Sequence, residues 1–131
     1  MTGLDTKVLV RSGMQDDPRQ SPRATSLIES LSAEEHGFVP VVVLLEPVWV
    51  LSGSYGLDRA QVTTVLSILL RSKELVVDRA ELVTQSLKRY RASGADFADA
   101  LIERMAASAG CAATMTLDAG AVKVAEITLV R

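Results

Sequence analysis

The chain has 131 residues, of which 48% are hydrophobic, and 14 basic against 16 acidic side chains give a formal net charge of −2. This length suits one domain with a sizeable core, and we expect a single domain over residues 1–131. The charge excludes nucleic-acid binding through overall attraction, because contact with nucleic acid would need a local basic patch or a bound cation. The single cysteine, Cys111, excludes an intrachain disulfide and a cysteine-based zinc site.

The sequence carries no signal peptide or membrane span that we can recognise. Its longest apolar run, residues 38–51, is interrupted by Pro40, Glu46 and Pro47 and is too short to cross a bilayer. Together with the lack of cysteine pairs, these features predict a soluble, cytoplasmic protein.

The first segment, residues 3–10, places an acid in an otherwise apolar stretch. Residues 8–10 predict a strand or the start of a buried helix, and we expect Asp5 at the end of a first strand. A carboxylate in such a setting costs several kcal/mol unless something pairs with it. Asp5 is therefore the first candidate functional residue.

The next segments alternate between helix and strand. Ser21 is the expected N-cap of a helix that follows a proline-rich connection at residues 16–22. Residues 38–43 form a continuous β-branched run that predicts a buried strand. Residues 44–54 predict a helix, with Trp49 in the core or at a dimer interface.

The second half continues the alternation. Asp58 is the expected N-cap of a helix that runs through Arg71, and Cys111 is expected as a small buried strand residue. The remaining segments are predicted as a strand at 75–77, a helix from 78 or 79 to about 90 that Ser93-Gly94 breaks, a helix at 96–109 stopped by Gly110, a strand at 111–117 and an edge strand at 122–130.

This order of elements predicts an α/β fold with a short parallel sheet and right-handed crossovers. In such folds, functional sites lie at the carboxyl ends of the strands. Asp5 and Asp118 each follow an expected strand, so we expect both on the same edge of the sheet.

Three other acids, Glu46, Asp96 and Asp99, are candidates beside Asp5 and Asp118. Asp96 and Asp99 lie three residues apart at the start of a helix, where an N-cap and a first-turn acid are ordinary structural residues. Asp118 has an ordinary interpretation as a turn residue. Glu46, with apolar neighbours on both sides, is harder to explain in that way.

If Asp5, Glu46, Asp99 and Asp118 converge, their repulsion must be relieved by protonation or by cations. A cluster of oxygen ligands without His or Cys selects hard ions such as Mg²⁺ or Mn²⁺. Such ions bind well where substrate phosphates complete their ligand shell, and they activate water. The chemistry indicated is hydrolysis of phosphodiester bonds.

Four segments, in order along nearly the whole chain, share a pattern with one known family. They are Leu4-Asp5-Thr6-x-Val8-Leu9, residues 43–51, residues 94–102 and Thr116-Leu117-Asp118. These segments resemble the PIN domain, and most of all the VapC-type toxins of toxin–antitoxin pairs. The resemblance implies a three-layer α/β/α sandwich with a short central parallel sheet. It also implies a homodimeric, metal-dependent ribonuclease that cleaves RNA and is held inactive by an antitoxin protein.

The resemblance also implies roles for individual residues. The catalytic and metal-binding acids would be Asp5, Glu46, Asp99 and Asp118. The supporting residues would be Thr6, Asp96 and Thr116, and the candidates for contact with RNA are Lys7 and Arg11.

Two residues depart from the family pattern. The family usually carries Asn at the position of Lys7, whose ammonium would either pair with the acids and compete with a metal or contact an RNA phosphate. Pro47 disfavours helical geometry at Glu46; its cost is small at a helix start and roughly 3 kcal/mol in a helix interior. Both departures favour an alternative, a catalytically impaired PIN-fold module that binds antitoxin or RNA.

A receiver-like phosphoacceptor is a weaker alternative, because Asp16-Asp17 lies in a proline-rich loop well past the strand.

Overall fold

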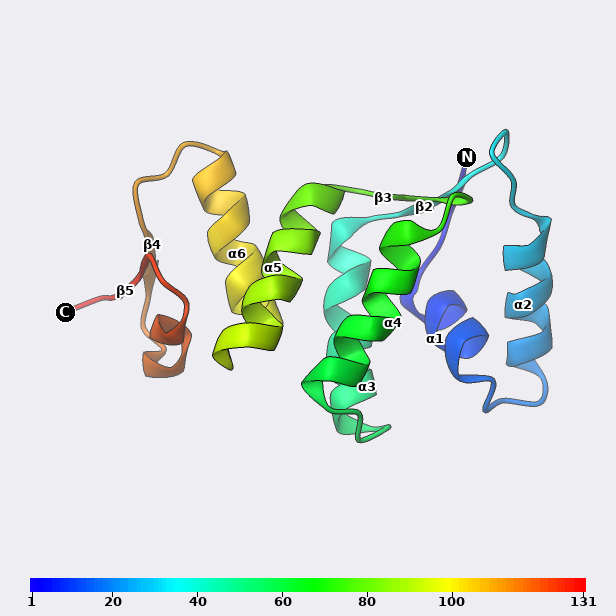
Figure 1. The fold of residues 1–131 in the computed structure, drawn as a ribbon, viewed down its shortest axis with the longest axis horizontal. Helices are drawn as coiled ribbons and strands as arrows, with labels where there is room; N and C mark the ends of the chain where they lie inside the picture. The colour runs from blue at the N-terminus through cyan, green and yellow to red at the C-terminus, as the bar shows by residue number, and fades with distance from the viewer. The chain divides into compact units, whose positions relative to one another are not determined.

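The structure is a computed structural model that describes all 131 residues and divides into two compact units, Met1–Ala80 and Glu81–Arg131. In chain order the elements are β1 (Thr2–Gly3), α1 (Thr6–Met14), α2 (Gln20–Ser30), β2 (Gly37–Val39), η1 (Val41–Leu44), α3 (Leu45–Gly53), α4 (Arg59–Arg71), β3 (Leu75–Val77), α5 (Ala80–Ser93), α6 (Phe97–Ser108), β4 (Thr114–Thr116), η2 (Ala119–Lys123) and β5 (Ile127–Leu129) (Figure 1). Helices alternate with short strands, and every strand pair is parallel. The predicted α/β fold with short parallel sheets is confirmed. None of the helices is both long enough and apolar enough to span a bilayer.

The first unit is built on a parallel sheet with the strand order β1-β2-β3. Its middle strand, β2, is shorter than the strand predicted at residues 38–43, and that prediction is wrong beyond Val39. Pro40 has no N–H to donate to a strand ladder, so the chain leaves the sheet there. The Val43 N–H instead donates to the Pro40 carbonyl at 3.0 Å, within the 3-10 turn η1.

Gly37, the first residue of β2, lies where three leucines close the core over the sheet. A Cβ at this position would lie 2.7 Å from Leu31 Cδ1, 2.8 Å from Leu4 Cδ1 and 2.9 Å from Leu75 Cδ2. Since real Cβ contacts are not that short, only glycine leaves room for this packing.

The segment after β1 is helical from Thr6 onward. The open choice between strand and helix for residues 8–10 is therefore decided for helix, and Leu9 and Val10 form its buried face. The expectation that Asp5 ends a strand in a buried setting is wrong, because β1 stops at Gly3 and Asp5 is the exposed N-cap of α1. Its carboxylate accepts a hydrogen bond from the Val8 N–H, which is the ordinary reason for an acid at a helix start.

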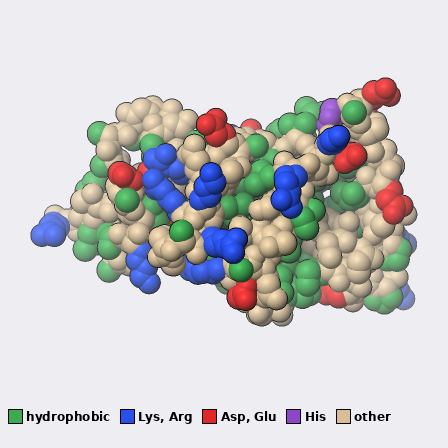
Figure 2. Space-filling model, viewed as in Figure 1, with side chains coloured by type: hydrophobic (Ala, Val, Ile, Leu, Met, Phe, Trp, Pro, Cys, Tyr) green, Lys and Arg blue, Asp and Glu red, His purple; other side chains and the backbone are tan.

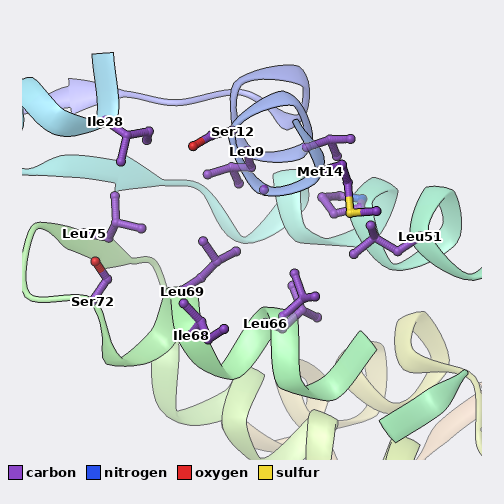
Figure 3. A pocket seen from close by; sticks show the side chains of 14 residues that line it. Leu9, Ser12, Met14, Ile28, Leu51, Leu66, Ile68, Leu69, Ser72 and Leu75 are labelled. Atoms are coloured by element: carbon purple, nitrogen blue, oxygen red, sulfur yellow. The ribbon is translucent and has the colours of Figure 1, made fainter. Parts of the chain in front are cut away.

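Helices α1 to α4 surround an apolar pocket of about 280 Å³ inside the first unit. Figure 3 shows side chains of α1, α3 and α4, among them Leu9, Leu51 and Leu66, turned toward this space. Trp49 does not join them, since it is 78% exposed, and the prediction that it could lie in the core is wrong. Helix α3 instead buries Pro47, Val48 and Leu51.

The second unit contains α5, α6 and the parallel pair β4-β5, which aligns Thr114 with Ile127. A small aliphatic cluster forms part of its core and consists of Ala95, Ala100, Ala121, Val124 and Ile127. Cys111 is exposed and precedes β4, so the prediction of a buried strand residue is wrong there. The strand starts only at Thr114, because the Cys111 N–H is used to close the turn after α6 by donating to the Ala106 carbonyl at 3.0 Å.

Glu103 on α6 is the one carboxylate of the second unit that is buried, at 1% exposure. Its Oε2 accepts hydrogen bonds from Arg104 Nε at 2.8 Å and from Arg89 Nη1 at 3.2 Å, and its Oε1 pairs with Arg104 Nη2. The hydrogen bond from Arg104 lowers the pKa of Glu103 below the usual value, against the opposing effect of burial and with the help of the Arg89 charge. Arg89 also reaches Glu126 at 3.4 Å, so the network ties α5 to α6 and to the turn before β5.

We predict that Glu103→Ala lowers the free energy of unfolding by about 3 kcal/mol at neutral pH, because two arginines lose their buried partner. Folding lowers this pKa, so the stabilisation is complete above the ordinary glutamate pKa and is lost as the pH falls through the folded-state value. Urea unfolding at pH 7 and in mild acid measures both effects. The control is Glu126→Ala at the 56% exposed partner, which should cost less than about 1 kcal/mol. Equal costs for the two variants would contradict the buried network.

Candidate functional site

The candidate acids fall into two sets, one in each unit. Asp5 and Glu46 belong to the first unit, and Asp96, Asp99 and Asp118 belong to the second. Within neither unit do three or more His, Cys, Asp or Glu side chains form a ready-made metal site.

Asp5 is held by its own helix. Its Oδ1 accepts the Val8 N–H at 3.2 Å, and no basic side chain pairs with the carboxylate. The second oxygen, Oδ2, has no hydrogen bond within the protein. The helix fixes the orientation of the carboxylate and leaves one oxygen available to a ligand.

Glu46 is the second residue of α3, exposed and without a basic partner. Pro47 is the third residue of that helix, so it lies in the first turn, where backbone N–H groups have no intrahelical acceptor. The proline therefore removes no hydrogen bond from within α3, because the residue four positions before it, Val43, belongs to the preceding turn η1. Glu46 keeps helical geometry in spite of the proline that follows.

A hydrogen bond joins the starts of the two helices that carry these acids. Thr6 Oγ1 donates to the Val43 carbonyl at 3.2 Å. This carbonyl lies four residues before Pro47, which has no N–H to offer it. The Thr6 hydroxyl thus supplies a donor that the α3 backbone lacks, and it ties the backbone beside Asp5 to the turn that leads to Glu46.

A cleft of about 400 Å³ opens between α1 and α3 in the first unit. It is lined by Thr6, Lys7, Val10, Arg11, Asp16, Glu46, Val50, Ser54 and Tyr55. Lys7 is exposed in this cleft and forms no ion pair with Asp5 or Glu46. Of the two possibilities foreseen for Lys7, pairing with the acids of its own unit is not observed.

Arg11 is held in place within the same cleft. It donates to Gln20 Oε1 at 2.8 Å, to Asp16 Oδ1 at 3.4 Å and to the Tyr55 hydroxyl at 3.4 Å. The Tyr55 hydroxyl in turn donates to Asp16 Oδ2. This hydrogen bond is the main cause that lowers the pKa of Asp16 and raises that of Tyr55. Sequence reasoning missed Tyr55, because no local pattern marks a contact that spans 39 residues.

In the second unit, Asp96 is the N-cap of α6 and accepts the Asp99 N–H at 3.2 Å, as the structural interpretation of Asp96 predicted. Asp99 is half-buried in the first turn of α6. Burial, then the charges of Asp96 and Asp118, raise the pKa of Asp99. Asp99 is therefore close enough to Asp96 and to Asp118 to be repelled by both carboxylates.

Asp118 follows the end of β4 and is fixed by the turn around it. Its N–H donates to Thr116 Oγ1 at 3.0 Å, and its Oδ1 accepts the Gly120 N–H at 2.9 Å. A Cβ at Gly120 would lie 3.3 Å from this Oδ1, so a larger residue would press on the carboxylate. Thr116 thus supports the Asp118 backbone, while the second carboxylate oxygen stays available.

The donor set suits a hard divalent cation. All the candidate ligands are carboxylates, and each lacks a Lys or Arg partner in its unit. A bound cation would stabilise the charged form of such unpaired acids, and oxygen ligands select Mg²⁺ or Mn²⁺.

Comparison with known families identifies the family to which the chain belongs. The model of the PIN domain matches residues 4–127, which include every candidate acid. The chain belongs to the PIN domain family. PIN domains are generally nucleases that use divalent metal ions, in agreement with the chemistry of the donor set. No curated protein matches the sequence of this PIN domain.

We predict that Thr6→Val lowers the free energy of unfolding by about 1 kcal/mol, because the Val43 carbonyl loses a donor. Thr6→Ser keeps the hydroxyl and serves as the control. Pro47→Ala supplies a backbone N–H four residues after Val43, so Thr6→Val should cost less in that background. Urea unfolding of the four members of this double-mutant cycle measures the coupling. The same cost in both backgrounds would show that the hydroxyl does not replace the missing helix donor.

Proposed function

We propose that this PIN domain is a metal-dependent endoribonuclease of the VapC type, the toxin of a toxin–antitoxin pair. Asp5, Glu46, Asp99 and Asp118 would together hold Mg²⁺ or Mn²⁺. The observation that carries the proposal is that these acids, in a chain of a nuclease family, have no basic partner. The proposal requires both sets of acids to bind the same ion.

The bound ion would supply an activated water and stabilise charge on the phosphate. The protein's own residues orient the ligands. The Val8 N–H fixes one oxygen of Asp5, and the Gly120 N–H fixes one oxygen of Asp118. Asp96 caps the helix that carries Asp99 and so acts as a supporting residue.

RNA binding also needs basic side chains, because the chain as a whole is acidic. On the face shown in Figure 2, Lys and Arg side chains gather over α5 and α6. Arg89 is engaged by Glu103 and Glu126, whereas Lys88 and Arg91 are exposed on the same helix. We propose that Lys88 and Arg91 guide the RNA backbone.

The proposal extends to protein partners. A toxin of this type would form a homodimer in the cytoplasm and be held inactive by an antitoxin protein. In the first unit, Trp49 on α3 is 78% exposed and Val42 on η1 is 66% exposed. Large apolar side chains left in water favour a protein partner.

A catalytically impaired PIN-fold module that binds antitoxin or RNA is the second candidate. It is favoured by Lys7, which brings an ammonium into the cleft that Glu46 lines. This candidate predicts that the acids bind no metal.

We predict that the purified protein cleaves single-stranded RNA with Mn²⁺ or Mg²⁺ and that EDTA abolishes cleavage. Asp5→Asn should lower the rate by a factor of about 100 or more, since the amide is a weaker ligand for a hard cation. The matched control is Glu29→Gln, an exposed acid-to-amide change on α2. Gel analysis of labelled RNA measures the rates, and cleavage that persists in EDTA or in Asp5→Asn would overturn the proposal.

A second experiment asks whether the two sets of acids share one ion. We predict that Asp5→Asn and Asp118→Asn each weaken Mn²⁺ binding at least about tenfold in titration calorimetry, because each removes a charged ligand. The outcome separates the candidates. Weakening by Asp5→Asn alone would remove Asp118 from the site, and a wild-type protein that binds no Mn²⁺ would favour the impaired module.

A further inference from the structure

We propose that the cleft between α1 and α3 binds a single unpaired nucleotide of the RNA. Its base would stack on the Tyr55 ring, and its phosphate would pair with Lys7. This inference rests on the proposed function for its ligand, RNA, but not on catalysis. It assigns a role to Tyr55, which the sequence pattern does not mark.

The dimensions of the cleft suit one nucleotide. Its volume of about 400 Å³ lies near the lower end of the range of small-molecule pockets, about 300 to 1,000 Å³. Thr6 and Arg11, which both line it, are five residues apart on one helix, or about 7.5 Å along its axis. An extended strand of RNA would need a longer groove.

The walls of the cleft combine the groups that a nucleotide needs. Val10 and Val50 provide an apolar surface, and the half-buried Tyr55 provides an aromatic ring. Unpaired bases stack on aromatic side chains, whereas the bases of a duplex are already stacked. The cleft therefore favours single-stranded over double-stranded RNA.

The Tyr55 ring is held in place before any ligand arrives. Its hydroxyl bonds to Asp16 and accepts a hydrogen bond from Arg11 at 3.4 Å, and Arg11 is itself fixed by Gln20 at 2.8 Å. Arg11 is thus a positioning residue for the ring, since its donors are already in use. A ring fixed in advance loses little entropy when a base stacks on it.

Lys7 is the cation of the cleft that remains free. Arg11 is paired with Asp16, whereas Lys7 is exposed and forms no ion pair. A phosphate at Lys7 would lie in the same cleft as Glu46, one of the proposed metal ligands. The nucleotide would thus be bound next to the proposed site of cleavage.

The test is binding of labelled single-stranded RNA to the full chain in EDTA, measured by fluorescence anisotropy, so that no cleavage occurs. We expect Tyr55→Leu to weaken binding about tenfold and Tyr55→Phe, which keeps the ring, to weaken it far less. Lys7→Gln should weaken binding and lower the salt slope by about one phosphate contact. A duplex of the same sequence should bind less tightly at this site.

Two matched variants serve as controls. Tyr55→Phe keeps the ring of Tyr55, and Lys73→Gln removes an exposed lysine of the same unit outside the cleft. Lys73→Gln should bind RNA as the wild type does. If Tyr55→Leu binds RNA as tightly as Tyr55→Phe, or if binding of the duplex is equally sensitive to Tyr55→Leu, the nucleotide site is wrong.

A competition arm separates a nucleotide site from a simple phosphate site. A ribonucleoside monophosphate should displace RNA from the wild type at lower concentration than inorganic phosphate does, and Tyr55→Leu should remove this difference. Equal competition by the two would overturn the role of the base.

The outcomes for binding and for cleavage are separable. Binding that depends on Tyr55 in a protein that cleaves no RNA would sustain the nucleotide site and reject the nuclease. Cleavage that depends on Asp5, together with RNA binding that does not change in the Tyr55 and Lys7 variants, would sustain the nuclease and reject the nucleotide site.

Discussion

The hydrogen bond from Thr6 to the Val43 carbonyl joins the start of α1 to the turn that leads into α3, the two helices that border the cleft. A proline follows four residues after Val43 and cannot donate to that carbonyl. A polar side chain from another helix takes the place of a backbone donor, so the donor that is missing at the junction of η1 and α3 is replaced by a tertiary contact. The cost of Pro47 is thereby offset in the same place where the chain needs α1 and α3 held together. Thr6 also lines the cleft between these helices.

Two carboxylates of the second unit, Glu103 and Asp99, have opposite electrostatic surroundings. Glu103 is buried and neutralised by Arg89 and Arg104, and its pKa falls. Asp99 is half-buried beside two other acids, has no basic partner, and its pKa rises. Buried acids are usually paired, whereas Asp99 is half-buried beside carboxylates alone, and its repulsion by them is relieved either by protonation or by a cation. PIN domains generally use divalent metal ions.

Several helix boundaries were predicted well, because caps and breaks depend mainly on neighbouring residues. The N-cap predicted at Ser21 is wrong, since α2 begins at Gln20 and Ser21 is buried inside it. Asp58 forms the predicted cap as a full capping box with Gln61, and Gly94 and Gly110 adopt the positive φ angles of helix ends. Strand lengths were predicted poorly, since pairing depends on distant partners. For the site, the types and order of the acids were readable from the sequence. The partners of Tyr55 were not, because contacts between residues 11, 16 and 55 leave no local pattern.

Lys7 and Pro47 were the two reasons to expect an impaired protein, and the structure weakens both. Pro47 lies in the first turn of α3, where no hydrogen bond within that helix is lost, and Glu46 remains helical and unpaired. Lys7 forms no ion pair with Asp5 or Glu46, so it does not occupy either carboxylate. A free ammonium beside carboxylates that bind a cation would be repelled by that cation, unless an anion lies between them. A substrate phosphate is such an anion, so Lys7 is compatible with a site that would bind metal and RNA together.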